Sequence, residues 1–317
     1  MEQRASQPQQ ISELFVNQLI EVDQAYFIAD DPGKNRKKWF GRFKGLGKIT
    51  RELAKLVTDA QDSIYIQTPY LVLSDPAVDL FKDIRKKSPD MDIRISTNSL
   101  AATDSWYVYA LSYKQKKTYL NNLKFIIYEI KPKPKDMNIF MPTYKQLRDR
   151  PFALSEMEQT GEPYICLHAK SMVIDDKVAF IGSYNLDPRS KNLNTEVGAV
   201  IQDGKFAKRL KDSIKKDMEP QNLWVIGKKK IPLRLTTPNT VLLEFSSLIP
   251  LLDPWPFQNI ASFELIEGKQ FVELDHKDFY DNYRDVGSFP QVNDTSGTKA
   301  IGAFMVKGFF SFVKPLL

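Results

Sequence analysis

Two hydrophobic periods alternate along the chain from Ile49 onward, one of two residues and one of three to four. Three runs with strand-like apolar content are "SIYIQTPY", "MDIRIST" and "LKFIIYEI". Between them, three longer runs space their apolar residues at helical intervals, namely "ITRELAKLVTDAQ", "DPAVDLFKDIRKK" and "DSWYVYALSYKQKKTYLNN". Strands that alternate with helices predict an α/β fold with a mainly parallel sheet that is covered on both faces.

The alternation divides the chain into three expected parts. Residues 1–48 hold a short amphipathic helix, a strand in "QAYFIADDPGK" and a basic run, residues 49–220 form the α/β domain, and residues 221–317 form an extension. Within the domain, residues 132–162 are a Pro- and Lys-rich insertion, and a connection of this length is usually functional. We expect the insertion to border the functional site.

Composition limits the compartment and the class of protein. The 317 residues are 42% hydrophobic and 12% aromatic, which can supply a sizeable core. Cys166 is the single cysteine, so no intrachain disulfide forms and a reducing compartment is expected. No uninterrupted apolar run approaches the roughly 18 residues that a membrane span needs. The expected location is therefore cytoplasmic, with any membrane contacted from outside.

The net charge of +6 is concentrated in one run, residues 33–48. The run contains no acidic residue, and its seven basic residues are Lys34, Arg36, Lys37, Lys38, Arg42, Lys44 and Lys48. With Trp39 and Phe40 among them, these cations suit an anionic membrane surface or nucleic acid. The alternative is an ordinary solvated loop.

The stretch "LHAKSMVIDDKVAFIGSYNLDPRSKNLNTEVG", residues 167–198, carries the candidate chemistry. It predicts a hairpin that turns near Asp175, and strand alternation would place His168 and Lys170 on one face. Gly182 lets the second strand approach closely, and Ser183 and Asn185, again two apart, can point into the same space.

These groups suit a phosphodiester, because Lys170, Ser183 and Asn185 can bind its charged oxygens. His168 can then attack phosphorus, provided that a carboxylate, Glu196 or Asp175, holds its other nitrogen. Each residue alone has a simpler explanation in a core, a rim or a turn. A metal site is a weaker explanation, because no second His or Cys stands at ligand spacing.

The full spacing, His168-x-Lys170, four residues, Asp175, six residues, Gly182-Ser183-x-Asn185, resembles the signature motif of the phospholipase D superfamily. Around it, residues 20–220 resemble the C-terminal half of bacterial cardiolipin synthases. The resemblance implies an α/β/α sandwich, no metal or other cofactor, and two steps through a phosphohistidine. It also implies that Lys170 binds phosphate, that Glu196 or Asp175 orients a histidine, and that Ser183 and Asn185 support the site.

The family normally joins two such motifs, and this chain has one. Its other histidine, His276, is followed by Lys at +1, Asp at +2 and Tyr at +7, so it fails the motif and is expected at the surface. Residues 1–32 resemble the end of a missing N-terminal half. Two explanations are open: the chain is a piece of a two-motif enzyme, or it dimerises so that two copies of His168 face each other.

Three functions are considered. The first is a phosphatidyltransferase or phospholipase on glycerophospholipids, bound peripherally at the cytoplasmic face of the inner membrane. The second is a phosphodiesterase or nuclease of the same superfamily that holds nucleic acid on residues 33–48. The third is a catalytically incomplete half that acts as a binding module. The apolar end, residues 301–317, either lies in the headgroup region or packs onto the domain.

Overall fold

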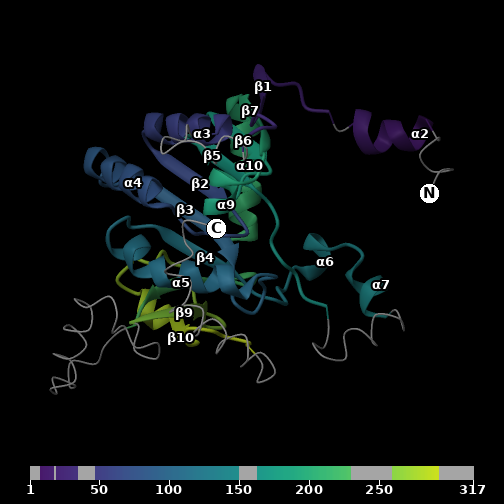
Figure 1. Ribbon diagram of the computed structural model, residues 1–317. Helices are drawn as coiled ribbons and strands as arrows, with labels where there is room; N and C mark the ends of the chain where they lie inside the picture. Colours follow the sequence, from purple (N-terminus) through teal and green to yellow (C-terminus); the bar gives the residue numbers. More distant parts are fainter. Residues whose placement is uncertain (1–7, 18, 35–46, 150–162, 230–258, 293–317) are drawn as a thin grey trace.

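One open sheet of ten strands organises the molecule (Figure 1). The computed structural model describes residues 8–17, 19–34, 47–149, 163–229 and 259–292. Across the sheet the strand order is β1-β7-β6-β5-β2-β3-β4-β8-β9-β10. The strands are β1 (Gln24–Ala29), β2 (Ser63–Gln67), β3 (Asp92–Asn98), β4 (Ile126–Ile130), β5 (Ser171–Ile174), β6 (Val178–Gly182), β7 (Val197–Gln202), β8 (Leu223–Lys228), β9 (Ile260–Leu265) and β10 (Tyr283–Asp285).

Strand direction changes from the centre of the sheet to its sides. At the centre, β2, β3 and β4 run parallel. On both sides of this centre the pairs are antiparallel, from β5 to β1 on one side and from β8 to β10 on the other. The α/β prediction is confirmed, and the parallel part of the sheet is its centre. The β5–β6 pair is joined by a short turn, residues 175–177, and such a turn requires antiparallel order.

Helices lie on both faces of the sheet (Figure 1). They are α2 (Pro8–Ile11), which continues as the π-helical turn η1 (Ser12–Val16), α3 (Lys48–Asp59), α4 (Asp75–Lys87), α5 (Trp106–Asn121), α6 (Met137–Phe140), α7 (Tyr144–Arg148), α9 (Pro188–Asn192), α10 (Gly204–Asp217) and α12 (Phe279–Asn282). Buried residues of α3 and α4 share one core with Tyr119 of α5, those of α10 and α12 share another, and Tyr109 and Tyr113 of α5 form a smaller cluster with Leu100. The result is the expected α/β/α sandwich.

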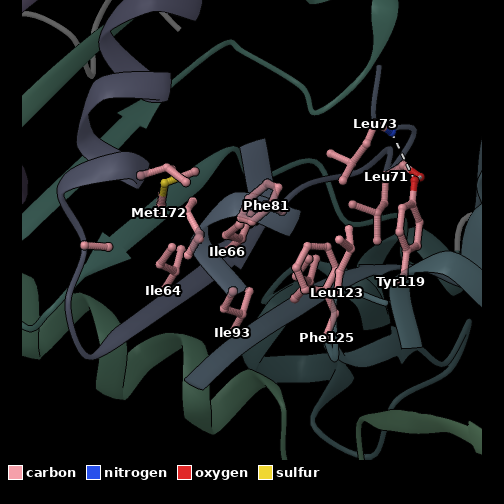
Figure 2. Close-up of a cluster of buried hydrophobic side chains, with 14 of the residues drawn as sticks. Ile64, Ile66, Leu71, Leu73, Phe81, Ile93, Tyr119, Leu123, Phe125 and Met172 are labelled. Carbon is pink, nitrogen blue, oxygen red and sulfur yellow. Dashed lines mark hydrogen bonds between the residues drawn. The ribbon is translucent and has the colours of Figure 1, made fainter. Parts of the chain in front are cut away.

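The two cores follow from the alternation of side chains along the central strands. In β2, Ile64 and Ile66 lie in the first core and Tyr65 lies in the second. Figure 2 shows the first core, where Phe81 of α4 packs near the β2 side chains and the Tyr119 hydroxyl accepts a hydrogen bond from the Leu73 amide at 3.0 Å. The sheet is therefore held from both sides, which fixes the strand ends where the candidate site lies.

Strands from all three parts of the chain join this sheet. β1 comes from residues 1–48, and β8, β9 and β10 come from residues 221–317. Among the described helices, none has the length and apolar content to cross a membrane. Most of the basic run (residues 35–46) and the whole apolar end (residues 301–317) lie outside the described residues.

Candidate active site

His168 and Lys170 lie in the extended segment that leads into β5. The predicted hairpin places both residues in its first strand, before the turn near Asp175, but β5 begins only at Ser171. His168 is exposed and Lys170 is partly buried. The two residues do come together, because the Lys170 ammonium donates a hydrogen bond to the backbone carbonyl of His168 at 2.8 Å.

A buried side chain, Asn98 at the end of β3, holds the residue before His168. Its Oδ1 accepts a hydrogen bond from the Leu167 amide at 2.8 Å, and its Nδ2 donates to the Leu167 carbonyl at 3.0 Å. The same Nδ2 donates to the Pro69 carbonyl at 3.2 Å. Asn98 thus makes the two hydrogen bonds to the Leu167 backbone that a neighbouring strand would otherwise make. The backbone next to His168 is therefore held in place although it does not belong to a strand. Sequence reasoning missed Asn98; its one signal is a polar residue that ends a buried central strand.

Lys170 is a partly dehydrated cation among carboxylates. Burial lowers the pKa of its ammonium, and the negative charges of Glu196 and Asp104 act in the opposite direction. A cation that has lost part of its water is well suited to bind an anionic oxygen, because less hydration has to be removed on binding.

Ser183 and Glu196 form a pair next to Lys170. The Gly182 amide donates to the Lys170 carbonyl at 3.0 Å, and a side chain at 182 would collide with the Val197 carbonyl. The Ser183 hydroxyl donates a short hydrogen bond to the Glu196 carboxylate and accepts one from the Val197 amide at 3.0 Å. The glycine therefore permits the close approach that the sequence predicts, and the serine is oriented by Glu196.

Asn185 follows this pair and has a buried side-chain oxygen. Its backbone amide donates to the Ser190 hydroxyl at 3.1 Å, whereas its buried side-chain oxygen has no hydrogen-bond partner within the described part of the chain. Buried polar atoms are normally satisfied, so an unsatisfied one at this place is a group that a ligand can complete. The amide can present either its oxygen or its nitrogen, since the two are interchangeable by rotation.

Asp30, a second buried residue that was not predicted from the sequence, forms hydrogen bonds with the backbone of Glu196. The backbone amide of Asp30 donates to the Glu196 carbonyl at 2.8 Å, and its carboxylate accepts from the Glu196 amide at 3.3 Å. The same carboxylate pairs with Lys34 at 2.5 Å and accepts from the Ile49 amide at 3.1 Å. One carboxylate thus ties β1, the start of α3 and Glu196 together.

Asp175 lies apart from this group. The four residues of β5 separate it from Lys170, and at about 3.3 Å per residue it stands at the opposite end of the strand. Its carboxylate accepts three hydrogen bonds, from the backbone amides of Gln61, Asp62 and Ser63. In this geometry Asp175 anchors the turn, and the catalytic role expected for it stays a prediction. Of the two candidate acids, Glu196 is the one whose charge acts on Lys170.

The second histidine is remote from the first. His276 is exposed, as expected, and lies in a turn before α12, beside the β9 and β10 edge of the sheet. It is 3.7 Å from Asp278. Within the described ranges, no group of three His, Cys, Asp or Glu side chains is arranged to hold a metal ion.

Known proteins resemble this chain over its α/β domain. The family model "Cardiolipin synthase, PLD-like domain" matches residues 53–218, more than half of the chain. Cardiolipin synthase C of Escherichia coli is 32% identical over 195 residues, which cover 59% of this chain and 37% of that protein. An uncharacterized protein of Helicobacter pylori is 30% identical over 196 residues, which cover 62% of this chain and 34% of that protein.

Among solved structures, NucT from Helicobacter pylori aligns with a TM-score of 0.41 at 15% sequence identity, over 63% of this chain and 98% of that one. The matched region spans little more than a third of the two curated relatives. The motif and the family match lead to one conclusion: the chain belongs to the phospholipase D superfamily, with a PLD-like domain of the cardiolipin synthase kind.

Proposed function

We propose that this chain supplies one catalytic half of an enzyme that cleaves or transfers phosphodiesters of glycerophospholipids through His168. The proposal is supported by the groups around Lys170, whose partly dehydrated ammonium bonds the His168 carbonyl: the Ser183–Glu196 pair, whose charge acts on Lys170, and the buried side-chain oxygen of Asn185, which has no partner among the described residues. The Lys170 ammonium and the Asn185 amide are donors that suit the non-bridging oxygens of a phosphodiester, and the Ser183 hydroxyl, which donates to Glu196, holds that carboxylate in place beside them.

In the proposed reaction, an imidazole nitrogen of His168 attacks phosphorus and the bond from phosphorus to the departing alcohol oxygen breaks. An acid from the other half protonates that oxygen. Water or an acceptor alcohol then attacks the phosphohistidine, its proton passes to the same group, and the bond from phosphorus to nitrogen breaks. Lys170 offsets the charge that builds on the phosphate oxygens in both steps.

The other half has to come from outside the described part of this chain, because His276 is remote. An apolar patch beside the site supports this requirement. Phe27 of β1, Ala199 of β7 and Ile181 of β6 are in register, and Val197 lies two residues from Ala199 on the same face. Phe27 is 71% exposed, and Ile181 and Val197 are each 41% exposed. Either a second copy or another segment of a longer protein would cover this patch and complete the site.

The proposed lipid substrate rests on those relatives that are named cardiolipin synthases, from Escherichia coli and Staphylococcus epidermidis. The proposal includes the location expected from the sequence, a peripheral position at the cytoplasmic face of the inner membrane. The nuclease alternative is an outcome of the same test.

The test is product analysis after incubation of the purified chain with vesicles of phosphatidylglycerol or phosphatidylethanolamine, and in parallel with single-stranded and duplex DNA. We expect lipid products that are lost in His168→Ala, retained within a few-fold in His276→Ala and insensitive to EDTA. Cleavage of DNA without lipid turnover would establish the nuclease alternative instead. No reaction with any substrate, at protein concentrations high enough for self-association, would leave the binding-module explanation.

A further inference from the structure

An exposed carboxylate, Asp104, stands at the edge of the candidate site with no role in the chemistry described above. It lies in the loop between β3 and α5. The Tyr70 hydroxyl, from the loop that follows β2, reaches both of its oxygens, at 2.9 and 3.0 Å. Both loops leave the carboxyl ends of parallel strands, the edge at which ligands bind in open α/β sheets.

Hydrogen bonds connect this pair to the reactive segment. Asn98 donates to the carbonyl of Pro69, the neighbour of Tyr70, and also holds Leu167, the neighbour of His168. One buried side chain therefore sets the spacing between the Tyr70 loop and the His168 segment.

The charge of Asp104 acts on the same segment. It favours the protonated form of Lys170, after Glu196 in strength. Burial is the main cause of the raised pKa values of Tyr164 and Cys166, and the Asp104 carboxylate contributes to both. Burial and the hydrogen bond to Asp104 also raise the pKa of Tyr70, so Tyr70 stays a donor and holds the carboxylate in place.

The position of Asp104 decides what it can bind. An ionised carboxylate offers about four lone-pair positions and only accepts hydrogen bonds, so Tyr70 leaves part of it open to solvent. Next to a phosphate on Lys170, it would repel a second phosphate and attract a hydrogen-bond donor. That preference suits a substrate with one phosphate and a polar alcohol, and it opposes a nucleic-acid backbone.

We propose that Asp104, held by Tyr70, determines head-group specificity by accepting a hydrogen bond from a hydroxyl or ammonium group on the alcohol side of a phosphodiester bound at Lys170. This inference rests on the proposed function, and it adds the chemical class of the alcohol. Two sources of the donor are distinguishable, a glycerol hydroxyl and an ethanolamine ammonium group.

The experiment measures kcat/KM of the full chain for three esters of phosphatidic acid: with glycerol, with ethanolamine and with p-nitrophenol, which carries no donor. The variant is Asp104→Asn, and the matched control is Asp83→Asn, an exposed acid on α4. We expect Asp104→Asn to lower the ratio of kcat/KM for a donor-bearing ester to that for the p-nitrophenyl ester by about tenfold or more. The control should leave this ratio within about twofold.

The ester with the larger fall identifies the donor as the hydroxyl or the ammonium group. An equal fall in kcat/KM for all three esters would overturn the inference, because it would show general damage to the site. Wild-type kcat/KM values for all three esters would overturn it as well. Inactivity of the wild-type chain toward all three esters would refute the proposed function itself, and the inference with it.

Discussion

Substitution of Asp175 separates an anchoring role from a catalytic one. This residue has a positive φ of 52°. Its Oδ1 accepts hydrogen bonds from the amides of Asp62 and Ser63 at 2.7 and 2.9 Å, and its Oδ2 accepts from the amide of Gln61 at 2.8 Å. These bonds fasten the β5–β6 turn to the junction between α3 and β2, on the far side of β5 from Lys170.

The magnitude follows from these contacts. Each bond is partly open to water, so about 1 kcal/mol of stability per bond is appropriate. Asp175→Ala loses all three bonds and adds about 1 kcal/mol for a left-handed backbone, giving a loss of about 4 kcal/mol. Asp175→Gly loses the bonds without that strain, about 3 kcal/mol. Asp175→Asn accepts the backbone conformation and keeps the two bonds to Oδ1, so it should lose about 1 to 2 kcal/mol.

The assay is urea unfolding followed by circular dichroism, together with turnover per folded molecule. Asp59→Ala, at an exposed acid near the same junction, is the control and should change stability by less than about 0.5 kcal/mol. We expect the order Asn, Gly, Ala in increasing loss of stability, with turnover of the folded Asn variant close to wild type. Wild-type stability in all three variants combined with lost turnover would refute the anchoring role.

Three further predictions concern other parts of the structure. Asn98→Ala should lower kcat per folded molecule about tenfold or more, because Leu167 loses both of its side-chain hydrogen bonds and His168 is no longer positioned; a kcat within twofold of wild type would contradict this. Wild-type activity should fall as pH rises through the lowered pKa of Lys170, where the ammonium loses its charge, and Lys170→Arg should move this alkaline limit of the pH–rate profile upward or remove it. Lys116→Met should destabilise the fold by about 3 to 5 kcal/mol in urea unfolding, because it leaves Glu129, now 2.6 Å from the ammonium, buried and unpaired; adding Glu129→Leu should restore much of that loss.

Local periodicity predicted most elements of the domain closely. The pattern that indicates a helix from Asp75 corresponds to α4, with Pro76 in its first turn, and "SIYIQTPY" corresponds to β2, which ends at Gln67 before Pro69. These elements were predictable because a helix buries one stripe of side chains and a central strand buries both of its faces. The apolar residues that become buried are therefore close together in the sequence.

The errors at the site have a different origin. Cys166 to Lys170 alternate as a strand does, but the backbone of Leu167 pairs with the Asn98 side chain, 69 positions earlier in the chain, instead of with another strand. The Asp30 carboxylate accepts a hydrogen bond from the Glu196 amide, 166 positions later in the chain. The Asp175 carboxylate accepts hydrogen bonds from three backbone amides more than 110 positions away. Spacing within the motif specifies which groups are present, and only the long-range contacts decide which of them meet.

Whether His168 is the nucleophile of a half-site can be measured by trapping its covalent intermediate. The chain is mixed with excess phosphatidylglycerol vesicles, quenched at alkaline pH within the first turnover, digested and analysed by mass spectrometry. We expect a phosphatidyl adduct on His168, absent in His168→Ala and unaffected by His276→Ala. Lipid product formed with the adduct on another residue, or formed at the wild-type rate by His168→Ala, would contradict this expectation.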